Sequence, residues 1–203
     1  INIWQGWGNT ARDFCFYRLD LEVKTTLRSS RIHHIGGFHQ IEVSKREDGT
    51  ADSIYLISVG LRPDPLDGDY SVVSLTEDIL KQLSPDDQRA FLNNLRRYGQ
   101  RSGDRGYDHE TMSEDPKYLR KYSIQLEAKA YDVSDPEVKI LRRDDIERSE
   151  FRDVVTNSVS FKIKLKDSDY SFNRDRIPQY NPLRLVEALD LLIPKHTPRA
   201  HPQ

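Results

Sequence analysis

The chain has 203 residues, 36% of them hydrophobic, and a net charge of −2, which suits one sizeable core. The near-neutral charge argues against a polycation that coats nucleic acid, and the single cysteine excludes a disulfide framework or a cysteine-rich zinc site. The apolar runs are too short to span a bilayer, so we expect a cytoplasmic protein with no membrane partner.

The first expected elements are two strands that form a hairpin, at residues 12–17 and 19–25. Apolar and polar residues alternate through both, which is the pattern of a half-buried strand. If the chain reverses at Tyr17 and Arg18, Asp13 faces Glu22 across the hairpin. Like charges directly opposite each other destabilise a ladder, so this pair predicts a compensating group, for which a divalent cation is the obvious candidate.

Further strands are expected along the chain. Residues 32–35 form a short one that ends at two glycines, and the near-continuous apolar run 53–62 predicts a buried central strand. Strands also fit residues 122–133 and 158–165, with a short one at 138–141.

Two helices are expected after the central strand. Ser74 and Glu77 have the spacing of a capping box for a helix to about residue 83. Ser84 with Pro85 then opens a second helix, which Gly99 ends.

The remaining segments complete the expected organisation. Residues 100–117 lack periodicity and predict a long loop, and residues 182–192 predict a final helix before a frayed tail. This order predicts an α/β fold with a mixed central β-sheet flanked by helices, and additional C-terminal strands and helix. One domain over residues 1–195 and a tail at 196–203 are expected.

The polar side of the hairpin carries groups suited to phosphodiester hydrolysis. Asp13 and Glu22 can share one hard cation, the Val23 carbonyl is available as a further ligand, and Mg²⁺ prefers such oxygen ligands. Lys24 points the same way as Glu22 and can orient an attacking water or stabilise charge on the phosphate oxygens. Cys15 lies beside the carboxylates, which raise its pKa, so it is a poor nucleophile.

Asp13 with "LEVKTT" resembles the PD-(D/E)XK nuclease core, the fold of many restriction endonucleases. More narrowly, "DFCF…LEVKTT…HHIGGFHQIEV…YLISVGLR" resembles bacterial PD-(D/E)XK motif proteins whose genes lie beside restriction-modification and phage-defence genes. The resemblance implies a restriction endonuclease-like fold and a DNA endonuclease that depends on Mg²⁺ or Mn²⁺. It makes Asp13 and Glu22 metal ligands and Lys24 the catalytic lysine. DNA is the implied partner, and other subunits of a defence system or a second copy of the chain are further candidates.

Two features depart from that family. Arg12-Asp13 stands where members carry Pro-Asp, which is common among divergent members. Members also carry an upstream helix, often with a glutamate, and we expect this N-terminal helix to be missing from this chain.

Residues that follow Lys24 are candidates for DNA contacts. Those directly after it are placed to bind phosphates, which fixes register without reading sequence: Thr25, Thr26, Arg28, Ser29 and Arg31. His33 and His34 point to opposite faces of a strand, so one packs inside while the other contacts phosphate or supports the site. By resemblance to related nucleases, Gln40 lines the site as a polar contact to DNA; otherwise it is an ordinary turn residue.

The charged hairpin also has simpler interpretations. It could be a solvated strand face in which Lys24 pairs with Asp20 or Glu22. The competing function is a non-catalytic nuclease-fold module that binds DNA or a partner protein.

Two other features of the sequence have ordinary explanations. Glu127-Ala128-Lys129 repeats the E-x-K spacing, but no acidic residue lies in a paired strand just upstream, so we expect a solvent face there. Trp4 and Trp7 could stack on a base, although we expect them to pack against the part of the protein that is missing upstream.

Overall fold

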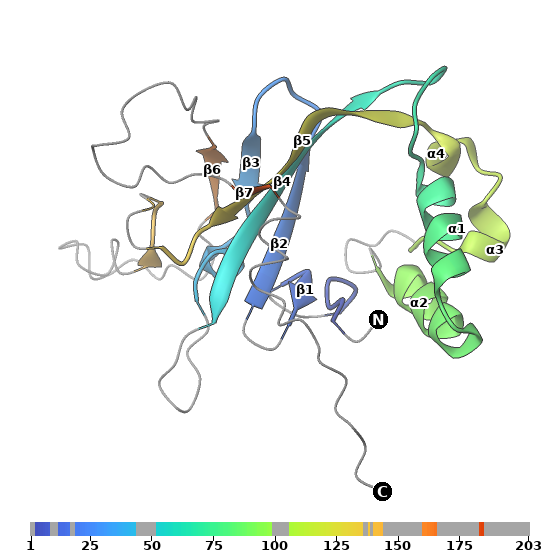
Figure 1. Cartoon of the computed structure of the whole chain (residues 1–203), viewed down its shortest axis with the longest axis horizontal. Coiled ribbons are helices and arrows are strands. Elements are labelled where there is room, and N and C mark those ends of the chain that lie inside the picture. Colours follow the sequence, from blue (N-terminus) through green and yellow to red (C-terminus); the bar gives the residue numbers. More distant parts are fainter. Residues whose placement is uncertain are drawn as a thin grey trace, which may run out of the picture.

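The computed structural model describes residues 3–8, 12–16, 19–43, 52–98, 106–135, 138, 140–143, 160–165 and 183–184. Over these residues the chain is a mixed α/β protein with a five-stranded sheet in the order β1-β2-β4-β5-β7 and a two-stranded sheet that pairs β3 with β6. Figure 1 shows helices α1 to α4 gathered on one side of the large sheet and the β3–β6 pair on the other. The predicted fold class is confirmed.

The large sheet is built around β4. Strand β1 (Phe14–Cys15) pairs antiparallel with β2 (Leu19–Thr26), which runs parallel to β4 (Ser53–Pro63). Strand β5 (Tyr122–Asp132) pairs antiparallel with β4 on its other side. The prediction of a buried central strand is therefore confirmed. Strand β4 is hydrogen-bonded to a neighbour on each side, and residues on both of its faces are buried.

Each face of the large sheet has its own apolar cluster. One contains residues of β2, β4 and β5: Leu19, Leu21, Tyr55, Ile57 and Ala130. The other joins alternate residues of the same sheet to residues of β3 (Ile32–Ile35), to the 3-10 helix η1 (Phe38–Gln40) and to residues next to these elements: Ile35, Phe38, Ile41, Ile54, Leu56, Tyr131 and Val133. Strand β6 (Phe161–Lys164) packs against this second cluster, within the range expected for that strand.

The first two helices follow β4. Helix α1 (Val72–Gln82) is capped by Ser71, whose side chain accepts from the Ser74 backbone N–H while the Ser74 side chain accepts from Ser71. The predicted capping box is therefore wrong by three residues, since Ser74 is the third helical residue and not the cap. Helix α2 (Pro85–Arg97) begins after Ser84 as predicted and ends at Arg97; Gly99, its expected end, lies outside the described residues.

The segment predicted as a long loop contains two helical turns. Helices α3 (His109–Met112) and α4 (Pro116–Leu119) each follow an aspartate whose side chain accepts a backbone N–H of the first turn. Such caps stabilise turns that are too short to show a hydrophobic period. No helix among the described ranges is long and apolar enough to cross a membrane.

Two predictions near the C-terminal end need correction. Leu183–Arg184 form β7, which pairs with Lys129 and Ala130 of β5, so these residues are not helical as expected. Pairing with a sheet edge here overrides their helix propensity, and the rest of the expected helix lies outside the described residues. No strand forms at residues 138, 140 and 141; the Arg142 guanidinium instead donates to the Val138 carbonyl and to two carbonyls before it.

Candidate active site

The hairpin has the register that places Asp13 opposite Glu22. Phe14 pairs with Leu21 and Cys15 with Asp20, and the Asp13 N–H donates to the Leu21 carbonyl at 3.2 Å. Continued by one residue, this register sets Asp13 opposite Glu22, and the charge of Asp13 contributes to the raised pKa of the Glu22 carboxyl. This is the register predicted from the alternation of the two strands.

Asp13 is held tightly by its surroundings. Its Oδ2 accepts the Val23 N–H at 2.8 Å, and its carbonyl accepts the N–H groups of Gln5 and Gly6. A Cβ at Gly6 would lie 2.8 Å from Oδ1 of Asp13, so any larger residue there would force the carboxylate to shift. The carboxylate is thus fixed through Oδ2, and Oδ1 is the atom left to bind a cation.

Glu22 and Lys24 form a close ion pair on the same face. The Lys24 Nζ lies 2.8 Å from Oε1 of Glu22, which is only 4% exposed. Burial raises the pKa of the Glu22 carboxyl, the neighbouring Lys24 opposes this, and the Asp13 charge raises the pKa further. A buried carboxylate beside a second one is favoured by additional positive charge.

This burial decides against the solvated strand face. A solvated strand face would require Lys24 to pair with Asp20 or Glu22, and Lys24 does pair with Glu22. However, the Glu22 carboxylate is buried and not solvated. Asp20, on the same face, is also buried and binds Arg12 at 3.3 Å. By contrast, the Glu127 side chain of the second E-x-K sequence is exposed, as expected for an ordinary solvent face.

Gln40 comes to Lys24 from η1. Its Oε1 accepts from the Lys24 Nζ at 3.1 Å and from the Gly36 N–H at 2.8 Å. The lysine amine therefore lies between the Glu22 carboxylate and the Gln40 amide. Two acceptors from different elements fix its position.

The two histidines lie on opposite faces of β3, as predicted. His33 is 3% exposed and its Nε2 lies 2.7 Å from the Ser58 Oγ, whereas His34 is exposed. Burial lowers the pKa of His33, a hydrogen bond with the Thr25 backbone opposes this, and the nearby Arg31 and Lys24 charges lower the pKa further. His33 is the packed histidine, and His34 is the one that a ligand can reach.

Arg31 does not fit the expected phosphate contact. It is 3% exposed, and its guanidinium donates to the Ser58 carbonyl at 2.9 Å and to the Glu127 carbonyl at 2.7 Å. It therefore ties β3 to β4 and β5 from inside the fold. Burial therefore corrects the expectation that Arg31 contacts DNA, and of the two candidate histidines it removes His33 and leaves His34.

The other expected DNA contacts divide by exposure. Thr26 is buried, and its hydroxyl accepts the Arg28 N–H at 3.1 Å, so it shapes the turn after β2. Accessible side chains remain in this part of the chain: Thr25, Arg28, Ser29 and His34. They belong to the end of β2, to the turn that follows it and to β3.

The tryptophans do pack, but against α2 and the residue after it and not against an upstream part, and so they bring α2 to the hairpin. The Trp4 ring centroid lies 5.6 Å from that of Phe91 and 6.3 Å from that of Tyr98, while the Trp4 backbone bridges to Phe14. Tyr98 was not predicted as part of the site. Its distance along the chain from the hairpin and the lack of a motif around it leave no signal in the sequence.

Cys15 is a poor nucleophile, as predicted. Burial, followed by the charge of Asp20 and a hydrogen bond to it, raises the pKa of the thiol to about 11. The thiolate is therefore scarce at neutral pH.

The donors at the hairpin suit a hard cation. Among the described residues no group of three or more His, Cys, Asp or Glu side chains converges on one point. The expected ligand set is smaller: the carboxylates of Asp13 and Glu22 and the Val23 carbonyl. The Val23 N–H donates to Asp13, so it points toward β1. The N–H and the carbonyl of a strand residue point to the same side of the strand, and the Val23 carbonyl therefore also points toward β1. These all-oxygen donors fit Mg²⁺, which keeps part of its water shell.

Comparisons with known proteins identify a family. No curated protein and no solved structure matches the chain. The model of the family described as "Putative PD-(D/E)XK family member, (DUF4420)" matches residues 1–156, a stretch that includes the hairpin and Gln40. The match covers most of the chain, which therefore belongs to the DUF4420 family.

Proposed function

We propose that this protein is a metal-dependent DNA endonuclease that hydrolyses phosphodiester bonds. The observation that carries the proposal is the arrangement of Asp13, Glu22 and Lys24 on two paired strands, with the lysine amine held by Glu22 and Gln40. Membership of a family described as PD-(D/E)XK supports it, since such proteins are typically nucleases.

The hairpin residues divide the chemistry between them. Asp13 and Glu22, with the Val23 carbonyl, would hold Mg²⁺ or Mn²⁺, which when bound polarises the phosphoryl oxygen and lowers the pKa of a water ligand. Lys24 stabilises the negative charge that develops on the phosphate oxygens and orients the attacking water. Gln40 keeps the lysine amine in place through its 3.1 Å hydrogen bond.

The substrate we propose is DNA, bound along the exposed end of β2. The accessible residues Thr25, Arg28, Ser29 and His34 would contact phosphates there. By the resemblance to proteins encoded beside restriction-modification and phage-defence genes, we place the activity in a bacterial restriction or defence system in the cytoplasm. Other subunits of that system or a second copy of the chain are its candidate protein partners.

A non-catalytic module that binds DNA or a protein is the second candidate. The Glu22–Lys24 ion pair favours it, because a lysine that already neutralises the buried carboxylate reduces the need for a metal. Titration calorimetry with Mg²⁺ and Mn²⁺ separates the two functions, since the nuclease should release or absorb heat that Asp13→Asn abolishes, and the module should give none.

Cleavage of supercoiled plasmid in Mg²⁺ tests the proposal directly. Glu22→Gln should abolish nicking because it removes a metal ligand. The matched control is Glu127→Gln, which changes the exposed glutamate of the other E-x-K sequence and should cut like wild type. If Glu22→Gln cuts as fast as Glu127→Gln, the proposal is wrong.

A further inference from the structure

The C-terminal end of α2 reaches the edge of the candidate active site. Tyr98, which follows the helix, packs its ring against Trp4. The Trp4 backbone bridges to Phe14, and the next two residues donate to the carbonyl of Asp13. One short segment, residues 3–8, thus contacts both the end of α2 and Asp13.

The Tyr98 side chain is open to a ligand. It is 54% exposed although part of its ring meets Trp4. Burial of part of the ring, followed by the charges of Asp13 and Glu22, raises the pKa of its hydroxyl. At neutral pH the phenol therefore keeps its proton and can donate one hydrogen bond.

Arg97 places a cation beside the tyrosine. Its guanidinium is exposed and lies 4.2 Å from the centre of the Trp7 ring, and the Trp7 Nε1 donates to the Trp4 carbonyl at 2.9 Å. Arg96 differs, because Asp108 and Glu110 bind its guanidinium. Arg97 thus stands over the segment that also supports Asp13, where it can meet an anion.

We infer that the end of α2 is a nucleic-acid contact site: the Tyr98 hydroxyl donates to a phosphate oxygen next to the cleaved bond, and the Arg97 guanidinium binds an adjacent phosphate. This inference rests on the proposed function, because it gives the backbone of the cleaved strand its position. Asp13 and Glu22 repel phosphates, and a donor and a cation beside them offset that repulsion and fix the register of the strand.

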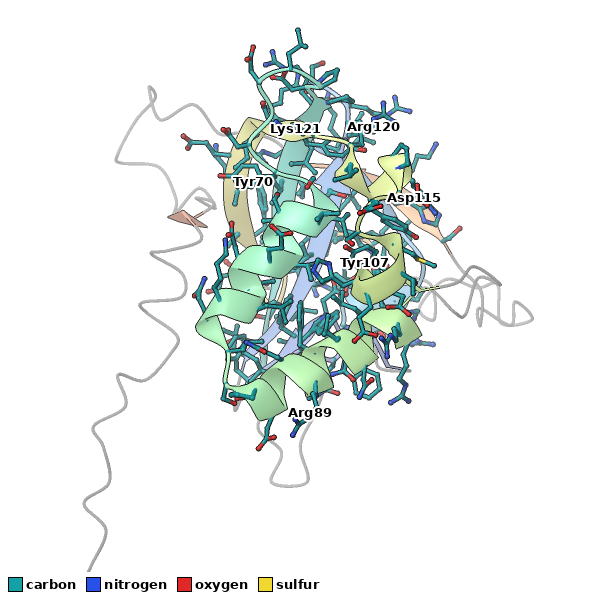
Figure 2. All side chains as sticks on the ribbon, turned by 90° about the vertical axis from the view of Figure 1, so that its right-hand side faces the viewer. Tyr70, Arg89, Tyr107, Asp115, Arg120 and Lys121 are labelled. Atoms are coloured by element: carbon teal, nitrogen blue, oxygen red, sulfur yellow. The ribbon has the colours of Figure 1, made fainter. Side chains whose placement is uncertain are left out.

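Two variants test the two contacts. Tyr98→Phe keeps the ring that packs on Trp4 and removes only the hydroxyl, while Arg97→Ala removes the cation. The controls are Tyr70→Phe and Arg89→Ala, at residues that Figure 2 shows at opposite ends of the group of helices. Arg89 is an exposed arginine of the same helix whose partner is Asp86, so its loss changes the net charge equally.

The assay measures binding and cleavage separately. Fluorescence anisotropy of a labelled duplex in EDTA gives Kd at several salt concentrations, and plasmid cleavage in Mg²⁺ gives the rate. We expect Tyr98→Phe to raise Kd about tenfold, the size of one lost hydrogen bond to a charged group. Arg97→Ala should also weaken binding and reduce the slope of log Kd against log salt by about one. The controls should stay within about twofold of wild type.

Each outcome shows which of the two proposals fails. Tyr98→Phe that binds like wild type overturns the hydroxyl contact, and an unchanged salt slope for Arg97→Ala overturns the phosphate contact. If wild type cuts DNA and both variants behave like the controls, the inference fails while the nuclease stands. If wild type binds DNA without cutting it and both variants weaken binding, the contact site stands and the nuclease fails. A protein that does not bind DNA refutes both.

Discussion

Replacement of Asp13 by asparagine should leave the metal-free protein about as stable as wild type. The change removes the repulsion between two carboxylates that face each other across the hairpin, which is worth about 0.2–1 kcal/mol for a cross-strand pair. It also weakens the hydrogen bond from the Val23 N–H to Oδ2, because an amide oxygen is a weaker acceptor than a carboxylate, at a cost of about 0.5–1 kcal/mol. The two terms oppose each other and differ by less than about 1 kcal/mol.

Magnesium should then separate the two proteins. At a Mg²⁺ concentration of about ten times Kd, binding to the folded state alone stabilises wild type by about 1.4 kcal/mol. For a chain of this size that corresponds to a rise in melting temperature of about 3–6 °C. Asp13→Asn loses one of two carboxylate ligands, so its melting temperature should not change.

Thermal melts by circular dichroism give the melting temperatures of wild type and Asp13→Asn, each with and without Mg²⁺. Glu127→Gln serves as the control, because it neutralises an exposed strand glutamate and should respond to Mg²⁺ like wild type. The reasoning is refuted if Asp13→Asn is less stable than wild type by more than about 1 kcal/mol without metal and Mg²⁺ changes neither protein. That result would mean that Asp13 is a structural hydrogen-bond acceptor and nothing more.

Three further predictions follow from the hairpin and the first helix. The pKa of Glu22 is raised on folding, so the folded state holds this proton more tightly than the unfolded state. The stability of metal-free wild type relative to Glu22→Gln should therefore rise as the pH falls from 8 to 5. Denaturant unfolding at three pH values measures this, and a flat or opposite trend would contradict it. The Cys15 thiol, with its pKa of about 11, should react with iodoacetamide at pH 8 about a hundredfold more slowly than an unperturbed thiol, and a rate like that of free cysteine would be incompatible with its burial. Ser71→Ala should cost about 1 kcal/mol in urea unfolding as the loss of a helix cap, whereas an effect under about 0.3 kcal/mol would show that the cap is dispensable.

The sequence was sufficient to predict the hairpin and the central strand. In the hairpin, strict alternation and a short reversal leave one register, which puts Phe14 opposite Leu21 and so Asp13 opposite Glu22. Strand β4 is recognisable because a run of branched apolar residues suits a strand that is covered on both faces. Both results depend on local pattern alone.

Features that depend on contacts between distant elements could not be predicted. Arg31 and His33 follow Lys24 closely, and only the packing of β3 onto Ser58 of β4 determines that they are buried. Tyr98 reaches the site because Trp4 connects α2 to the hairpin. In these cases the partner comes from another strand or helix, and no pattern near the residue identifies it.

The start of α1 shows the same limit at smaller scale. Two serines three residues apart both suit a cap, and each has a plausible partner downstream. The backbone of Tyr70 pairs with Tyr122 of β5, which holds the chain extended up to the residue before Ser71. The helix therefore begins directly after Ser71, for a reason that lies in β5.

The rate at which Lys24→Ala cuts plasmid DNA in Mg²⁺ tests the central claim most directly. Lys24 has no place in the metal ligand set, so its loss should leave Mg²⁺ binding intact while it reduces the cleavage rate by at least about a hundredfold, as the removal of one preorganised donor does. Lys129→Ala, at the lysine of the second E-x-K sequence, is the matched control and should cut at the wild-type rate. If Lys24→Ala cuts as fast as Lys129→Ala, the hairpin is not the catalytic site of this protein.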